Sequence, residues 1–415
     1  MSGSTPRHVW FVNHHALIPA KDGGTGRHIN LARRLPEHGW SASLIVASTI
    51  HADGSQALRG FRLRRLTSEL GVPTLWIRAM AYGRSQAKRL IGMTTFAGGL
   101  LRPGATRGLR RPDAVLGSTV HLLAAFAAWR LARRRRVPFI FEIRDVWPDT
   151  LIHFGQLKPG SPLARAMERL SLLLVRKADL VVSPLPAMDR YLAEHGFPDK
   201  PFLWISNGIS GDEVQALPTR REDDGFTFMY LGSLNNGNAI DGIIEAFAQA
   251  VRVRPDANLH LRIVGGGPLR GELEALAERI GVAGAVQFEQ RIPEAEVIAR
   301  AQEADCLVAN LRDSPLYAYG ISLNKLYMYM SASRPIVFAG TAANNPVADA
   351  EAGLVVPGDD REGIAASMLE MVDTPLAQRQ KLAENGFRYV MANFAHGALA
   401  RDLAAALDDL VQEQE

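Results

Sequence analysis

The chain has 415 residues, of which 47% are hydrophobic and 22% charged, and its formal net charge is +4. This balance excludes a disordered chain, and the length predicts two domains of roughly 200 residues each. The single cysteine, Cys306, excludes an intrachain disulfide, and its apolar neighbours predict a buried thiol. No run reaches the roughly 18 apolar residues of a membrane span and no signal peptide is recognisable, so we expect a cytoplasmic protein.

The two halves of the chain carry opposite charge. Residues 1–205 hold 30 Lys and Arg against 13 Asp and Glu, whereas residues 206–415 hold 17 against 30. The basic first half predicts an anionic partner, which would be a membrane surface, a phosphorylated acceptor or a nucleic acid.

At the start of the chain, a strand over 8–12 leads into a glycine-rich loop over 21–26 and an amphipathic helix over 27–37. Gly24 and Thr25 of this loop allow a ligand to approach the backbone at the start of the helix. A dinucleotide-binding loop is not indicated, because the spacing is not G-x-G-x-x-G and the next strand ends without an acidic residue. A plain structural turn is the alternative.

A basic segment follows, in which residues 70–112 include no acidic side chain. Basic residues among large apolar ones are typical of a segment that lies on an anionic membrane. One alternative is nucleic-acid binding, which no motif supports, and another is a solvated basic face whose apolar residues lie in the core. The basic residues are Arg78, Arg84, Lys88, Arg89, Arg102, Arg107, Arg110 and Arg111, and the apolar ones are Leu75, Trp76, Ile77, Met80, Leu90, Ile91, Met93, Phe96, Leu100 and Leu101.

A strand over 138–143 is followed directly by Arg144 and Asp145. Because α/β sheets place their ligand sites at the carboxyl ends of strands, this pair is a candidate for catalysis. A structural ion pair is the alternative. His121, at the start of a helix over 120–136, is interpreted as a helix-entry residue and a weaker candidate.

The second half repeats the alternation of strands and helices after a polar linker that ends at Gly225. This alternation predicts an α/β protein with two doubly wound parallel sheets. Asn324 and Lys325 lie in the first turn of a helix over 323–331, where free backbone N–H groups, the helix dipole and an ammonium group suit a diphosphate. An ordinary loop-to-helix entry is the alternative.

Five segments carry a family resemblance: DGGTGRHINLARRL at 22–35, FEIRDVWPDTLIHFG at 141–155, SPLARAMERLSLLLVRKADLVVSP from 161, IVGGGPL at 263–269 and YGISLNKLYMYMSASRPIV from 319. In this order they resemble the GT-B glycosyltransferases of family 4, above all the bacterial branch that includes N-acetyl-L-fucosaminyl transferases of polysaccharide assembly. Together they span nearly the whole chain.

The resemblance implies two facing Rossmann-like domains with a cleft between them. Residues 1–206 would form the acceptor-side domain and residues 207–390 the nucleotide-sugar domain. Residues 391–415 would form a helix that crosses back onto the first domain or ends the second. The implied reaction is a retaining, metal-independent transfer of a hexose or N-acetylhexosamine from a nucleotide diphosphate, which we expect to be UDP, without a cofactor.

The acceptor is expected to be a hydroxyl of a lipid-linked saccharide, which would place the enzyme peripherally on the cytoplasmic face of the membrane. A soluble natural-product acceptor is an alternative. A third interpretation is a non-catalytic protein of this fold that regulates a partner transferase. No nucleic-acid partner is expected.

By the same resemblance, Asp145 polarises or deprotonates the acceptor hydroxyl, Arg144 holds its charge or binds phosphate, and the nucleotide base rests near Arg291 and Ile292. The other donor-binding residues that the resemblance implies are Gly24, Thr25, Gly232, Ser233, Asn238, Gly266, Gly320, Ser322, Asn324, Lys325 and Met328.

The chain departs from the family at the donor site. Gly320 and Met328 stand where many members carry two carboxylates, the second of which binds the ribose, and Ser233 and Asn238 replace a common Arg and Lys. Losing one charged hydrogen bond costs about 1.5 to 3 kcal/mol. These departures predict weak donor affinity, an unusual donor or a loss of catalysis, and they leave Lys325 as the obvious cation for the diphosphate.

Overall fold

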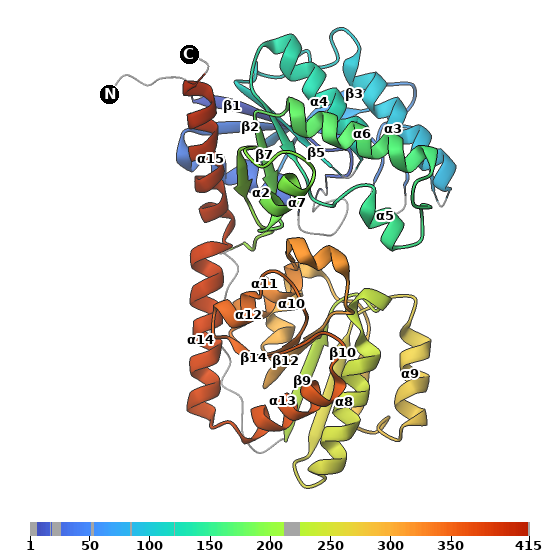
Figure 1. Cartoon of the computed structure of the whole chain (residues 1–415), viewed down its shortest axis with the longest axis vertical. Helices are drawn as coiled ribbons and strands as arrows, with labels where there is room; N and C mark the ends of the chain where they lie inside the picture. Colours follow the sequence, from blue (N-terminus) through green and yellow to red (C-terminus); the bar gives the residue numbers. More distant parts are fainter. Residues whose placement is uncertain are drawn as a thin grey trace. The chain divides into compact units, whose positions relative to one another are not determined.

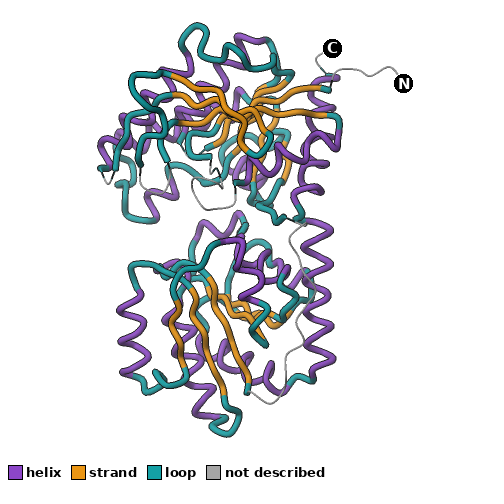
Figure 2. The backbone as a smooth tube through the Cα atoms, turned by 180° about the vertical axis from the view of Figure 1, so that it is seen from behind, coloured by secondary structure: helices purple, strands orange, loops and turns teal. Residues whose placement is uncertain are grey.

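The computed structural model describes residues 6–16, 18, 26–50, 54–83, 85–119, 121–210 and 225–413, with the backbone alone at 86 and 87. The chain forms two compact units, Met1–Ser206 with His396–Glu415, and Asn207–Ala395. Each unit contains one sheet with helices on both faces (Figures 1 and 2). The sequence predicts a last segment from residue 391; the last helix, α15 (His396–Gln412), begins at His396 and belongs to the first unit.

The first sheet has eight strands in the order β3-β4-β2-β1-β5-β6-β7-β8. Its central strands are apolar runs buried on both faces, as parallel strands between two helical layers require. The strands are β1 (Arg7–Val12), β2 (Trp40–Ala47), β3 (Arg64–Glu69), β4 (Val72–Ile77), β5 (Ala114–Ser118), β6 (Phe139–Glu142), β7 (Leu180–Ser183) and β8 (Phe202–Trp204).

One strand departs from the predicted parallel arrangement. Strand β3 runs antiparallel to β4, and the two are joined by a tight turn at Leu70 and Gly71. Both turn residues have positive φ, 49° and 84°, which is the backbone conformation that two-residue hairpins prefer. The edge of the first sheet is therefore a hairpin within the basic segment.

Helices cover both faces of the first sheet (Figure 1). Helices α3 (Gln86–Leu101), α4 (Leu122–Arg135) and α6 (Pro162–Lys177) pack on one face, and α2 (Arg27–Arg34) packs with α15 on the other. The 3-10 turn η1 (Leu35–His38) continues α2, and α5 (Asp149–His153) and α7 (Met188–Glu194) are short.

The apolar residues of the basic segment divide between core and surface. Leu75, Trp76, Ile77, Phe96 and Leu100 are buried, whereas Met80, Leu90 and Ile91 are exposed. The buried residues therefore belong to the core, as one of the predicted alternatives had it, and an interfacial role is wrong for them. The exposed group keeps the interfacial interpretation open.

The second sheet has six parallel strands in the order β11-β10-β9-β12-β13-β14. Helices α8 (Ile240–Val253), α9 (Arg270–Arg279) and α13 (Arg361–Asp373) share one core with it. On the other face lie α10 (Glu294–Ala301), α11 (Asn324–Ser331), α12 (Pro346–Asp349) and α14 (Leu376–Asn393). The strands are β9 (Phe226–Leu231), β10 (Leu259–Val264), β11 (Val286–Glu289), β12 (Cys306–Asn310), β13 (Ile336–Ala339) and β14 (Gly353–Val356).

Cys306 is fully buried at the start of β12, which confirms the predicted buried thiol, and burial raises its pKa. In the part of the chain that the structure describes, no helix combines the length and hydropathy needed to cross a bilayer.

Candidate functional site

Two glycine-rich turns meet at the carboxyl ends of β9 and β10. The Gly232 N–H donates to the Val264 carbonyl at 3.0 Å, and the Leu234 N–H donates to the Gly266 carbonyl at 3.0 Å. A Cβ on Gly265 would lie 1.9 Å from the carbonyl oxygen of Gly232, so only glycine allows this contact between the two backbones. The turns present bare backbone at the edge where parallel sheets bind ligands.

Polar side chains fix the turn after β9. The Tyr230 hydroxyl donates to the Ser233 carbonyl at 2.9 Å, and the Asn238 Nδ2 donates to the same oxygen at 2.7 Å. Asn235 Nδ2 donates to Ser233 Oγ at 3.2 Å. Ser233 and Asn238 therefore stabilise the shape of this turn.

Lys325 lies against this turn from helix α11. Its ammonium donates to Asn238 Oδ1 and lies 5.2 Å from the centre of the Tyr230 ring. The side chain is half-buried, and burial lowers its pKa to about 7. The structure thus joins two predicted site residues, Asn238 and Lys325, and places a weakly solvated cation beside the glycine-rich backbone.

Helix α11 is held in place by Tyr329. The Leu231 N–H donates to the Tyr329 hydroxyl at 2.7 Å, and this hydroxyl donates to the Leu231 carbonyl at 2.9 Å. The N-cap is Leu323, whose side chain cannot accept a hydrogen bond from the first turn, and Asn324 is exposed. Helix α11 is therefore fixed to the end of β9, and Lys325 lies at its N-terminus, the positive end of the helix dipole.

The loop before α11 is closed by two asparagines. Asn344 accepts from the Ile321 N–H at 2.7 Å and donates to the Ile321 carbonyl at 3.1 Å. The Asn207 N–H donates to Ser322 Oγ at 2.9 Å. Gly320 has a φ of 105°, a left-handed conformation that favours glycine. Ser322 therefore holds the loop to the start of the second unit.

The remaining predicted donor residues differ in setting. Met328 and Ile292 are partly buried against the apolar core under α11, so Met328 contributes packing there. Arg291 is exposed, and its Cβ lies 3.8 Å from where a Cβ on Gly266 would be. Gly24 and Thr25 lie outside the described residues.

In the first unit, Arg144 and Asp145 follow β6 but do not pair with each other. The Arg144 N–H donates to Thr119 Oγ1 at 2.9 Å, and neither side chain forms an ion pair within the described ranges. The interpretation as a structural ion pair is therefore wrong. Asp145 is exposed at the sheet edge, yet partial desolvation of its carboxyl raises the pKa of this group. The positive charge of Arg144 offsets only part of this rise.

A charged cluster behind this edge was not predicted from the sequence. Glu142, which is buried, accepts from Arg27 Nε at 2.9 Å and lies 2.7 Å from His28 Nε2. Burial acts to raise the pKa of Glu142, but the charges of His28 and Arg27 outweigh it and hold this pKa well below its usual range. Arg27 also donates to the Ile205 carbonyl at 2.6 Å, so the cluster ties α2 and β6 to the chain after β8.

His121 caps helix α4, as interpreted from the sequence. Its Nδ1 accepts from the Ala124 N–H at 3.2 Å, and the ring is buried. Burial, with the nearby charges of His15 and Arg89, lowers its pKa well below the usual value. A neutral capping ring is a structural element, and nothing in the geometry assigns it to catalysis.

The sequence matches two family models, one described as Glycosyl transferases group 1 over residues 225–374 and one as Glycosyl transferase 4-like domain over residues 23–208. A probable glycosyltransferase, WbjE of Pseudomonas aeruginosa, is 23% identical over 341 residues, which cover 77% of this chain and 82% of that protein. A GDP-mannose-dependent α-(1-6)-phosphatidylinositol monomannoside mannosyltransferase of Mycolicibacterium smegmatis is 32% identical over 139 residues, about a third of each chain (32% and 35%).

Solved structures share the fold along the chain. Sucrose-phosphate synthase from Thermosynechococcus elongatus aligns with a TM-score of 0.73 at 17% identity, covering 98% of this chain and 100% of that one. Anabaena HepE in complex with UDP and glucose aligns with a TM-score of 0.64 at 13% identity, covering 97% and 99%.

Proposed function

The chain belongs to the GT-B glycosyltransferases of family 4, and from this we propose that it transfers a sugar from a UDP-sugar to an acceptor hydroxyl with retention of anomeric configuration. That it uses a nucleotide-sugar donor follows from the family. The choice of UDP, the retained configuration and the absence of a metal requirement are our proposals, as is an N-acetylamino sugar, which rests on the sequence resemblance.

The observation that carries the proposal is Lys325. When the anomeric C–O bond to the diphosphate breaks, negative charge builds up on the departing phosphate. Lys325 and the start of α11 lie together at the carboxyl edge of the second sheet, where an ammonium and the positive end of the helix dipole can stabilise that charge. Lys325 thereby compensates for the Arg and Lys that Ser233 and Asn238 replace, and no metal is needed in this role.

On the acceptor side, we propose that the Asp145 carboxylate polarises the attacking hydroxyl or accepts its proton. A carboxylate with a raised pKa is a stronger base than an ordinary aspartate, which suits polarising or deprotonating a hydroxyl. The new glycosidic bond forms to the acceptor oxygen as the bond to the diphosphate breaks. Arg144 is placed next along the chain, where its charge keeps the carboxylate available.

We further propose that the acceptor is a lipid-linked saccharide at the cytoplasmic face of a membrane. The first half of the chain is strongly basic, and its exposed apolar residues include Met80, Leu90 and Ile91. Relatives include mannosyltransferases whose names specify phosphatidylinositol mannosides as acceptors. Acidic lipids would attract such a surface with about 1 kcal/mol per basic residue.

Calorimetric titration with UDP, without added metal, tests the donor assignment. GDP is the sharpest control, because two relatives are named as GDP-mannose-dependent. We expect selective UDP binding that Lys325→Ala weakens by roughly 10- to 100-fold, the equivalent of one charged hydrogen bond. Preferential GDP binding would overturn the choice of UDP, and unchanged affinity in Lys325→Ala would remove Lys325 from the site.

A further inference from the structure

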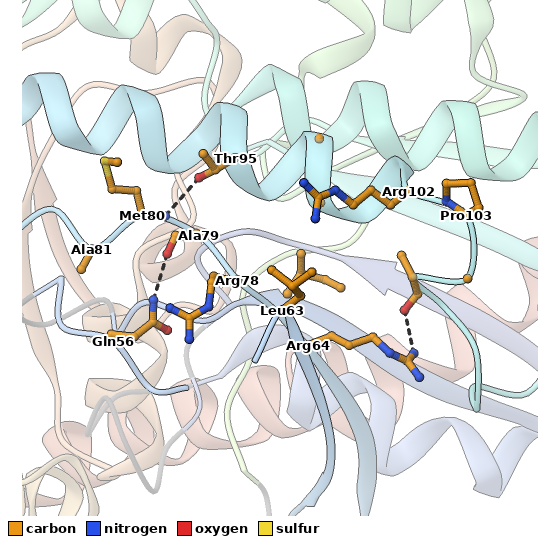
Figure 3. Close-up of a pocket in the computed structure, with 15 residues that line it drawn as sticks. Gln56, Leu63, Arg64, Arg78, Ala79, Met80, Ala81, Thr95, Arg102 and Pro103 are labelled. Carbon is orange, nitrogen blue, oxygen red and sulfur yellow. Dashed lines mark hydrogen bonds between the residues drawn. The ribbon is translucent and has the colours of Figure 1, made fainter. Parts of the chain in front are cut away.

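A pocket of about 880 Å³ opens in the first unit between the β3–β4 hairpin and helix α3 (Figure 3). Its walls come from the start of β3, from residues 78–81 after β4, and from the end of α3 with the turn that follows. Hydrogen bonds fix these walls to one another: the Met80 N–H donates to Thr95 Oγ1 at 3.0 Å, and Gln56 Nε2 donates to the Ala79 carbonyl at 2.9 Å. The pocket is therefore part of the fold.

The lining combines an apolar surface with three arginines. Leu63, Ile77 and Met80 contribute apolar surface, and Arg64, Arg78 and Arg102 contribute positive charge. Figure 3 draws Leu63 between Arg78 on one side and Arg64 and Arg102 on the other. Such a lining suits a ligand that is part hydrocarbon and part anion.

The positive charge of the lining is not neutralised. Arg64 donates to the Ala105 carbonyl at 2.8 Å and Arg78 Nε donates to the Arg62 carbonyl at 2.7 Å, so their partners are uncharged. The Arg102 guanidinium has no hydrogen bond or ion pair with any described residue. The segment 59–111 contains 12 basic residues and a single acidic one, Glu69. An anion entering the pocket would therefore meet cations, and none of the described residues that line it is a carboxylate.

Exposed apolar side chains also occur along the β3–β4 hairpin and helix α3, which form the pocket. Of the 13 large hydrophobic residues exposed among the described residues, seven fall between 61 and 91: Phe61, Leu63, Leu66, Leu70, Met80, Leu90 and Ile91. Phe61 is fully exposed, at 101%. A soluble polyanion would gain nothing from these side chains, whereas a lipid bilayer buries them. The surroundings thus favour a lipid over a nucleic acid.

We propose that this pocket binds the phosphate group and the adjoining hydrocarbon of an anionic lipid drawn from a membrane. Arg102 contacts the phosphate, with Arg64 and Arg78 supplying further positive charge. Leu63 and Met80 contact the hydrocarbon. This inference deepens the proposed function and rests on its lipid-linked acceptor.

The pocket is an anchor separate from the reacting groups. It lies at the carboxyl end of β4, and Asp145 lies at the carboxyl end of β6 in the same sheet. Four strand spacings separate these strands, which corresponds to about 19 Å across the sheet. A lipid phosphate in the pocket would thus leave room for saccharide units between it and a hydroxyl at Asp145.

Two probes test the pocket in the full-length protein. The first is dihexanoyl phosphatidic acid below its micellar concentration, titrated by calorimetry beside inorganic phosphate and dihexanoyl phosphatidylcholine. We expect saturable one-to-one binding of the phosphatidic acid, at least tenfold tighter than either control. The second is cosedimentation with phosphatidylcholine vesicles that contain phosphatidic acid, compared with vesicles of phosphatidylcholine alone. We expect binding to the anionic vesicles only.

Three variants make the test specific. Arg102→Glu reverses the free charge, and Gly98→Trp fills the pocket from α3, where a Cβ has no atom within 4 Å. We expect both to weaken phosphatidic acid binding at least tenfold. Arg176→Glu, a matched charge reversal at an exposed and unpaired position of α6, should change it less than twofold. Wild-type affinity in Arg102→Glu and Gly98→Trp, or equal binding of inorganic phosphate, would overturn the proposal.

A UDP titration of each variant separates this inference from the donor assignment. The pocket lies in the first unit and the donor residues in the second, so we expect UDP affinity to be unchanged in all three variants. If the wild type does not bind UDP, the proposed function is contradicted. If the wild type binds UDP but does not bind phosphatidic acid, only the proposal for the pocket is contradicted.

Discussion

At the scale of single residues, Lys325 determines how the donor site responds to pH. Burial lowers its pKa to about 7 in the free protein, so the neutral amine becomes the main form as the pH rises above neutrality. A diphosphate binds the charged form better. Affinity should therefore be constant below pH 7 and fall by up to tenfold per pH unit above it, since the proton must be taken up on binding.

This dependence is measurable by titration with a UDP-sugar between pH 6 and 9, because its diphosphate has no group that titrates near neutrality. Lys325→Arg is the matched control, since guanidinium stays charged over this range and the affinity should become independent of pH. A wild-type affinity that does not change between pH 7 and 9 would contradict the lowered pKa of Lys325 in the free protein.

Several residue-level contacts could not be predicted from the sequence. Asn238 and Lys325 were each identified as site residues, but their contact joins positions 87 apart and depends on the shape of the turn after β9. Arg144 and Asp145 are adjacent and so suggested an ion pair. Both residues lie in a bend after β6, and their side chains form no ion pair with described residues. Glu142 and Arg27 lie 115 positions apart, and only the order of the strands brings them together.

At the scale of elements, the site depends on how α11 is attached to β9. Tyr329 is fully buried, and its hydroxyl is the hydrogen-bond partner of both backbone groups of Leu231. Tyr329→Phe would leave these groups unsatisfied, which costs about 1 to 3 kcal/mol for a buried donor. We expect the second unit to unfold at lower urea concentration and UDP affinity to fall severalfold, because the first turn of α11 is less firmly held.

This effect is measured by unfolding the protein in urea and monitoring hydrogen exchange in peptides from β9 and α11. Tyr317→Phe is a suitable control, since it removes the same atom from a half-buried tyrosine whose hydroxyl has no hydrogen bond with a described residue. Equal effects of the two substitutions would show that the Tyr329 hydroxyl does not hold the helix.

Most elements were predictable because their apolar pattern is strong, and the exceptions have identifiable causes. Strands such as β5 and β12 are unbroken buried runs between loops. Strands β3 and β4 were both missed, because both lie in the segment interpreted as basic and interfacial, and RRLTSE of β3 is half exposed. Pairing with β4 through the turn at Leu70 makes it a strand, and a leucine with positive φ gives no sequence signal for a turn.

At the scale of the whole molecule, the last helix completes the first unit. The sequence left open whether it would join the first domain or the second, because an amphipathic helix has an apolar face that either core could cover. In the structure Leu399, Leu403 and Leu407 of α15 enter the core of the first unit. Asp408 accepts from Trp40 Nε1 at 3.0 Å and from Arg7 at 2.8 Å, and these contacts fix the helix to β1 and β2.

The first unit should therefore be unstable without the end of the chain, although residues 1–206 form most of it. Leu403 is 1% exposed, and Leu403→Ala should destabilise this unit by about 2 to 5 kcal/mol, as cavity-forming substitutions in well-packed cores do. Hydrogen exchange should increase in β1 and β2 and stay unchanged in β9 and β12. Leu376→Ala, at an exposed position of α14, should leave both units unaffected. If Leu403→Ala instead increased exchange in the second unit alone, α15 would belong to that unit, and the assignment of the first core would be wrong.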